Sequence, residues 1–134
     1  MDRKEIIAFF NERPRNCLLC TANKKGEPNV AAYGSPRMID EDTIVLAARK
    51  RRSFRNLQEN PRAAILVAEA SEIKNDSKAV RIYLELIATE TEGDLLNEFK
   101  KTVGERIGKE AAASLHAAMR FKITEVRSLV ESTA

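Results

Sequence analysis

The chain has 134 residues, of which 43% are hydrophobic and 32% are charged, and its net charge is +3 at pH 7. This length suits a single domain, and the apolar content excludes a disordered chain. No apolar run approaches the roughly 20 residues that span a bilayer, and the first residues lack the apolar core of a signal peptide. We therefore expect one domain over residues 1–134, in a soluble cytoplasmic protein with no membrane partner.

The first residues predict a helix that ends before Pro14. Asp2 can cap this helix, and Glu5 stands three residues further on, which is the spacing of a capping box. The apolar side chains form one stripe, which consists of Ile6, Phe9 and Phe10. The helix should therefore bury this face against the rest of the protein.

A hairpin is predicted to follow the helix. Residues 16–22 are a short apolar run, and residues 23–28 contain Gly26 and Pro28, which favour a turn. Residues 29–39 predict the second strand. The two strands should therefore pair with each other.

Cysteine and histidine are scarce in this chain. Cys17 and Cys20 lie three residues apart on a predicted strand, so they point to opposite faces and suit neither a disulfide nor a shared metal. His116 is the single histidine, and its alanine-rich surroundings favour a helical position. With so few of these residues, a metal site would need unusual additional ligands, and a histidine-based nucleophilic site would need unusual partner residues. We therefore expect no metal and assign no catalytic residue.

The middle of the chain predicts three strands and one short helix. Residues 43–48 and 62–70 are apolar runs typical of buried strands. Between them, a helix of about two turns is predicted from Ser53 and is closed by Pro61. Residues 78–93 alternate between apolar and polar side chains, which predicts a strand with one face in the core.

The C-terminal third predicts a helical excursion and a last strand. Residues 93–119 are predicted to be helical, with a break near Gly108. One stripe of this excursion is apolar and consists of Leu96, Phe99, Val103 and Ile107. Residues 121–130 predict the last strand. The sequence leaves open whether residues 93–119 border a site or cover one end of a barrel.

These elements indicate a mainly β (α+β) protein. Six strands are predicted, and most gaps between them are shorter than the dozen or more residues that a parallel crossover needs. We therefore expect a six-stranded antiparallel barrel or sandwich with peripheral helices.

Residues 49–55 hold a cluster of cations with no acidic residue among them. The cations are Arg49, Lys50, Arg51, Arg52 and Arg55. A buried strand leads into this cluster and a helix begins at Ser53, so free backbone N–H groups and the helix dipole would favour an anion there. A phosphate held by Arg52 and its neighbours is one interpretation. A solvated charged loop is the other.

The order of these elements and several local motifs resemble a known family. The strand and turn in TANKKGEPNVAAYG, the basic turn, the short helix and the segment NPRAAILV are similar to the FMN-binding split barrel of the pyridoxamine 5'-phosphate oxidase-like superfamily. The likeness covers about residues 5–90, and the last strand FKITEVRSLV also fits. The resemblance implies a split β-barrel, FMN as the cofactor, and a homodimer with the flavin at its interface.

The resemblance also implies which residues hold the cofactor. Arg52 and Ser53 would contact the phosphate, with Arg49, Lys50 and Arg51 near them. Further residues on two strands would meet the isoalloxazine ring, and these are Tyr33, Gly34, Ser35, Ala47 and Ala48.

Departures from the family pattern limit the function that the resemblance implies. Ala31 and Ala32 stand where members often carry polar side chains, and Ser53 stands where a lysine is common. The C-terminal arginine-histidine motif of true pyridoxamine phosphate oxidases is missing, so that activity is not expected. The open alternatives are an FMN-dependent oxidoreductase with a small-molecule redox substrate, a non-catalytic flavin or electron carrier, and a haem or deazaflavin binder. The electron donor and acceptor stay unassigned.

A barrel that binds nucleic acid is a further alternative from the basic segment. The chain has no tryptophan and two tyrosines, so stacking platforms for single strands are poorly supplied. Binding in a groove would require a wider basic surface than one turn. We therefore do not expect nucleic acid as a partner.

Overall fold

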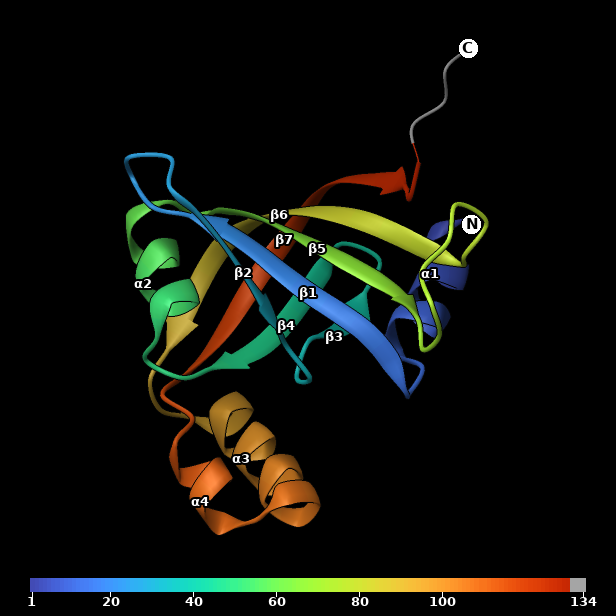
Figure 1. Cartoon of the computed structure of the whole chain (residues 1–134). Coiled ribbons are helices and arrows are strands. Elements are labelled where there is room, and N and C mark those ends of the chain that lie inside the picture. Colours follow the sequence, from blue (N-terminus) through green and yellow to red (C-terminus); the bar gives the residue numbers. More distant parts are fainter. Residues whose placement is uncertain (131–134) are drawn as a thin grey trace.

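The computed structural model describes residues 1–130, so the last four residues of the expected domain lie outside the described residues. Figure 1 shows a curled sheet with helices around it. Its strands are β1 (Arg15–Ala22), β2 (Pro28–Ala32), β3 (Arg37–Asp40), β4 (Thr43–Ala48), β5 (Arg62–Glu69), β6 (Ala79–Glu90) and β7 (Ala117–Ser128). The helices of the described chain are α1 (Arg3–Asn11), α2 (Arg52–Glu59), α3 (Asp94–Ile107) and α4 (Lys109–Ala113).

The seven strands form one antiparallel sheet in the order β2-β1-β5-β6-β7-β4-β3. The two edge strands, β2 and β3, follow each other in the chain and are joined by residues 33–36 alone. A linker of this length spans less than roughly 18 Å when fully extended, so the sheet must curl until its two edges come close. The result is a split β-barrel, which confirms the predicted fold class with seven strands in place of six.

The extra strand arises because residues 29–39 do not form one strand, as the sequence had suggested. Gly34, Ser35 and Pro36 interrupt this segment, and Pro36 has no N–H to donate to a ladder. Residues before the interruption pair with β1, and residues after it pair with β4. The prediction of one continuous strand was therefore wrong.

Most apolar side chains meet in one large core inside the barrel. Helix α1 covers part of this core with the predicted face of Ile6, Phe9 and Phe10, and its predicted capping box between Asp2 and Glu5 is present. The largest fully buried side chains of the strands include Leu19, Leu46, Ile82, Met119 and Phe121. This core fixes the strands that carry the site described below.

Helices α3 and α4 form an excursion between β6 and β7. Figure 1 shows the two helices beside each other, away from the curled sheet. Their apolar side chains pack on one face of β4 and the start of β7 in a second, smaller cluster. It consists of Val45, Ala47, Leu96, Phe99, Leu115 and Ala118. The predicted break at Gly108 is confirmed, since that residue separates α3 from α4 with a φ of 104°.

The helical prediction was wrong at the end of this excursion. Residues 117–119 belong to β7, where Ala117 pairs with Ala48 and Met119 pairs with Leu46. Alanine favours helices, but pairing with a buried strand overrides that preference here. Ile107, expected on the apolar stripe, is 67% exposed.

The remaining predictions concern the cysteines and the membrane. Cys17 is buried and Cys20 is exposed, both as free thiols, so the expected opposite orientation is confirmed. Within residues 1–130, every helix is too short or too polar to cross a membrane.

Candidate functional site

A cavity of about 510 Å³ lies at the split of the barrel. One wall comes from β2, residues 33–36, β4 and the start of α2, and we call it the barrel wall. The opposite wall is one face of α3. This volume falls in the range of cavities that hold small organic ligands and cofactors.

The start of α2 gives the barrel wall a site for an anion. The helix begins at Arg52, and its N-cap, Arg51, makes no side-chain capping bond. The first N–H groups of such a helix point toward the preceding turn, where the helix dipole favours negative charge. Arg51 and Arg52 are both exposed and line the cavity. The structure therefore brings charge and free donors to one end of the cavity.

Ser53 is the buried polar group at this end, with 3% of its surface exposed. Its Oγ accepts a hydrogen bond from Asn29 Nδ2 of β2 at 3.2 Å. Tyr33 is also hydrogen-bonded to the Ser53 side chain. Burial raises the pKa of the Tyr33 phenol, while this hydrogen bond and the charges of Arg49 and Arg51 act in the opposite direction. Tyr33 therefore stays protonated at neutral pH and packs against the barrel core.

Ser35 connects the linker between β2 and β3 to β4. Its hydroxyl donates to the carbonyl of Ala47 and accepts from the N–H of Ala47, both at 3.0 Å. The pairing of β3 with β4 ends at Arg37 and Val45. Beyond that pair, the Ser35 side chain supplies the hydrogen bonds that a neighbouring strand would otherwise give to Ala47. The N–H of Ala47, a residue expected beside the flavin ring, is therefore already bonded.

The predicted site residues are brought together with two exceptions. Eight of them line the cavity: Tyr33, Gly34, Ser35, Ala47, Arg49, Arg51, Arg52 and Ser53. Lys50 is exposed outside the lining, and Ala48 is buried in the barrel core. Lys50 was expected near the phosphate and Ala48 beside the ring, and neither residue lines the cavity.

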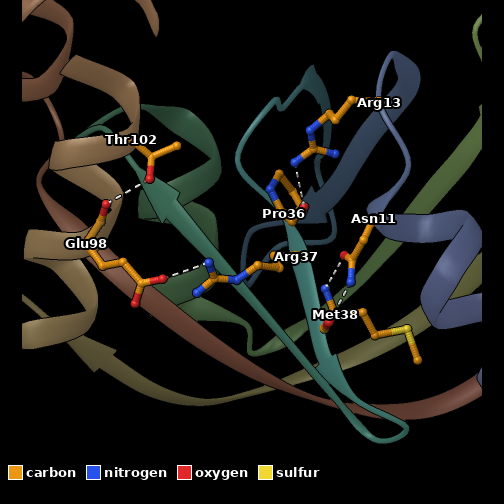
Figure 2. Close-up of polar contacts among 7 residues, drawn as sticks. All are labelled: Asn11, Arg13, Pro36, Arg37, Met38, Glu98 and Thr102. Atoms are coloured by element: carbon orange, nitrogen blue, oxygen red, sulfur yellow. Dashed lines mark hydrogen bonds and ion pairs between the residues drawn. The ribbon is translucent and has the colours of Figure 1, made fainter. Parts of the chain in front are cut away.

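Polar contacts join the helical excursion to the barrel, and the sequence had singled out neither Arg37 nor Glu98 for them. Figure 2 shows Arg37 of β3 reaching across to Glu98, where its Nη1 lies 2.8 Å from Glu98 Oε1. The Arg37 guanidinium also lies 5.5 Å from the centre of the Phe99 ring. Arg49 Nε donates to Ser114 Oγ at 2.7 Å and thereby ties β4 to the end of α4. These contacts hold the excursion against the barrel.

Asn11 and Arg13 fix the other side of the linker. As Figure 2 shows, the Asn11 side chain bonds both backbone groups of Met38, at 2.8 and 2.9 Å, and so closes the free edge of β3. Arg13 Nη2 donates to the carbonyls of Gly34 at 3.0 Å and Pro36 at 3.4 Å. Arg13 also lines the cavity.

The sequence held one usable signal for the α3 wall. Residues three and four apart share a face of a helix, and the cavity side of α3 follows this spacing. Its members are Glu98, Phe99, Thr102, Val103, Arg106 and Ile107. Asn29 and Arg13 had no such signal, because their neighbours in the site lie more than 20 residues away in the chain.

The comparisons with solved structures agree with the described fold. An FMN-binding protein from Syntrophomonas wolfei is 26% identical, with a TM-score of 0.80, and the match covers 96% of this chain and 87% of that one. The heme storage protein HutZ from Vibrio cholerae is 22% identical, with a TM-score of 0.66 and 92% of each chain covered. An F420 reductase is 15% identical, with a TM-score of 0.67 and coverages of 95% and 97%. The last two matches, at these identities, show a shared fold alone.

Among curated proteins, none matches the chain. The family of pyridoxamine 5'-phosphate oxidase, by contrast, matches residues 3–130, which is nearly the whole sequence. This match, the split barrel and the cavity at its split establish that the chain belongs to the pyridoxamine 5'-phosphate oxidase family.

Proposed function

We propose that this protein binds FMN in the cavity at the split of the barrel and acts as an oxidoreductase. The observation that carries the proposal is the α2 end of the cavity, where an uncapped helix start, a buried hydroxyl and several arginines meet. This donor set suits a phosphate, since charge-assisted bonds and helix N–H groups are its usual partners. The FMN-binding protein from Syntrophomonas wolfei, which has the same fold, adds support.

The residues present fit both parts of the cofactor. Ser53 and the first N–H groups of α2 would hold the phosphate, with Arg51 and Arg52 supplying charge. Ala31 and Ala32 offer a wall of small side chains, and Phe99 offers an apolar surface opposite to them. A flat aromatic ring is compatible with these surroundings.

The chain's own residues would position the cofactor and limit the access of water. When bound, FMN supplies the transfer of a hydride or of single electrons. The Asn29–Ser53 bond sets the orientation of the hydroxyl at the phosphate end, and the Ser35–Ala47 bonds hold the linker against β4. No side chain of the cavity has to serve as a general base for this role.

A homodimer belongs to the same proposal. Apolar side chains remain exposed at the cavity, with Val30 of β2 at 60% and Ile107 of α3 at 67%. Contact with a second copy would bury such side chains and shield a bound flavin. Sedimentation velocity with and without FMN measures the oligomeric state, and a monomer in both conditions would contradict the proposed dimer.

Haem has less support from the cavity. The single histidine, His116, stacks edge-on against Phe54 at 5.0 Å and does not border the cavity. Tyrosine can also hold haem iron, but the Tyr33 side chain is bonded to Ser53.

The test is a visible absorption spectrum of the purified protein, repeated after FMN is added and unbound FMN is removed by desalting. Retention of a flavin spectrum at about one FMN per chain is the expected result. Loss of all flavin would overturn the proposal, and a Soret band would redirect it to haem. Oligonucleotides serve as a negative control, because binding of nucleic acid in place of FMN would assign the basic segment to that role.

A further inference from the structure

A second group of cations lies at the other end of the cavity. Arg13 reaches this end from the connection between α1 and β1, and Arg106 reaches it from the last turn of α3. Arg13 is held in place by its bond to the Gly34 carbonyl at 3.0 Å. The cavity is therefore cationic at two separate places.

Strand β2 gives the separation of the two ends. Asn29 of β2 contacts Ser53 at the α2 end, and Gly34 contacts Arg13 at the other. β2 ends at Ala32, so the five residues from Asn29 to Gly34 span at most roughly 16 Å. A phosphate held at Ser53 would lie at the α2 end of the cavity, which leaves Arg13 and Arg106 at the other end for a different anionic group.

The charge at this second end lacks a counter-ion. Among residues 1–130, Glu98 is the one acid that lines the cavity, and it is paired with Arg37. Within residues 1–130, no ion pair joins a carboxylate to Arg13 or Arg106. Partial burial is the main cause that lowers the pKa of Arg13, and repulsion by the positive charge of Arg106 acts in the same direction. A bound anion between them would relieve this repulsion.

The surface next to these cations is apolar. Phe99, Val103 and Ile107 lie along the same face of α3 as Arg106. A ligand that matched this end would therefore combine an apolar body with an anionic group.

We propose that Arg13 and Arg106 form a subsite for the carboxylate or phosphate group of an organic substrate, whose apolar part lies along α3. The inference rests on the proposed function, because this substrate would share the cavity with FMN. It extends that function by naming the chemical class of the substrate.

The experiment uses three probes of similar shape, which are benzoate, phenyl phosphate and neutral benzamide. Isothermal titration calorimetry measures their binding to the full chain, both without FMN and after loading with FMN. We expect at least one of the two anions to bind at least tenfold more tightly than benzamide. A comparison of the affinities of benzoate and phenyl phosphate shows whether the subsite prefers a carboxylate or a phosphate. Equal binding of benzamide and both anions would overturn the proposal.

Arg106→Ala provides the test of the named residue, and Lys101→Ala on the same helix is its matched control. Among residues 1–130, the side chains that bond the carbonyls of Gly34 and Pro36 are those of Arg13 and Arg15, so removal of Arg106 should leave that linker intact. Thermal melting checks the fold of both variants. Loss of one charge-assisted contact should weaken binding of the tighter anion about tenfold in Arg106→Ala. Lys101 lies outside the cavity lining, so its variant should bind as the unchanged protein does.

The two proposals can fail separately in this design. Retention of FMN together with equal anion binding in Arg106→Ala and the unchanged protein would overturn the subsite alone. Anion binding that depends on Arg106 in a protein that retains no FMN would support the subsite and overturn the proposed cofactor.

Discussion

The two walls of the cavity are held in place by different kinds of contact. The barrel wall is continuous with the seven-stranded sheet, and in β4 the residues Ile44, Val45 and Leu46 are completely buried. The α3 wall rests on the smaller cluster around Leu96 and Phe99 and on polar contacts such as Arg37 with Glu98. One wall therefore shares the stability of the whole core, and the other depends on few contacts.

This difference separates a fixed wall from an adaptable one. Segments with few buried apolar contacts open locally, at a lower free energy than the whole fold. The proposed phosphate end belongs to the barrel wall, where hydrogen bonds from Asn29 and Ser35 side chains hold Ser53 and Ala47 in place. Recognition of a substrate along α3 would rest on the part of the molecule that opens more easily.

The largest expected effect comes from the core behind the barrel wall. Phe121 of β7 is 0% exposed, and Phe121→Ala should lower the free energy of unfolding by about 3 to 5 kcal/mol through lost burial and a cavity. Urea denaturation followed by circular dichroism measures this loss. Phe121→Leu serves as the milder control. A loss below about 1 kcal/mol for the alanine variant would contradict the rigid barrel wall.

The second effect concerns the cluster that supports the α3 wall. Leu96 is 2% exposed, and Leu96→Ala should cost about 2 to 3 kcal/mol, since a small cluster collapses more easily around the missing atoms. Hydrogen exchange should show the increased opening confined to residues 94–116. Ile107→Ala, at an exposed position of the same helix, should change stability by less than about 0.5 kcal/mol. Faster exchange spread evenly over the barrel would mean that the two walls form one cooperative unit.

The third effect tests the phosphate end of the barrel wall. Arg52→Ala should weaken FMN binding by about 1.5 to 3 kcal/mol through loss of a charge-assisted contact, with the low end expected because Arg52 is exposed. Quenching of flavin fluorescence during a titration measures the affinity. Arg55→Ala is the matched control, because Arg55 is exposed on the same helix and does not line the cavity. Unchanged affinity in Arg52→Ala would remove Arg52 from the site.

The smallest effect concerns the ion pair between the walls. The side chains of Arg37 and Glu98 are 38% and 55% exposed, so a double-mutant cycle with Arg37→Ala and Glu98→Ala should give a coupling energy of less than about 1 kcal/mol. High salt should reduce this coupling. A coupling above about 2 kcal/mol would show that the ion pair, and not the apolar cluster, holds the α3 wall.

Local patterns were sufficient for most of the secondary structure. The capping box of Asp2 and Glu5 acts over three residues, and the alternation in β6 repeats every two residues, so both are visible without the fold. The helix start beside Arg52 was found in the same way, from a buried strand, a run of cations and a serine. Local preference was misleading at residues 117–119. Their sequence favours a helix, but pairing with β4 makes them part of a strand.

Part of the site was expected from the sequence. The run of cations indicated residues 51–53, the family resemblance implied residues 33–35, and both groups line the cavity. The α3 wall was left undecided, because nothing in residues 93–119 tells which way the excursion folds. Its position follows from the packing of Leu96 and Phe99 on Val45 and Ala47.

The sequence by itself determined most elements of this protein, their antiparallel character, and the cations at the start of α2. Each depends on residues within a few positions of one another, where hydrogen bonding and side-chain direction are set by local geometry. Only the tertiary structure decided that the edge strands β2 and β3 come close, that Asn29 bonds to Ser53, and that Arg13 and Arg106 line the same cavity. These contacts join distant parts of the chain, so they depend on the curling of the sheet around one core.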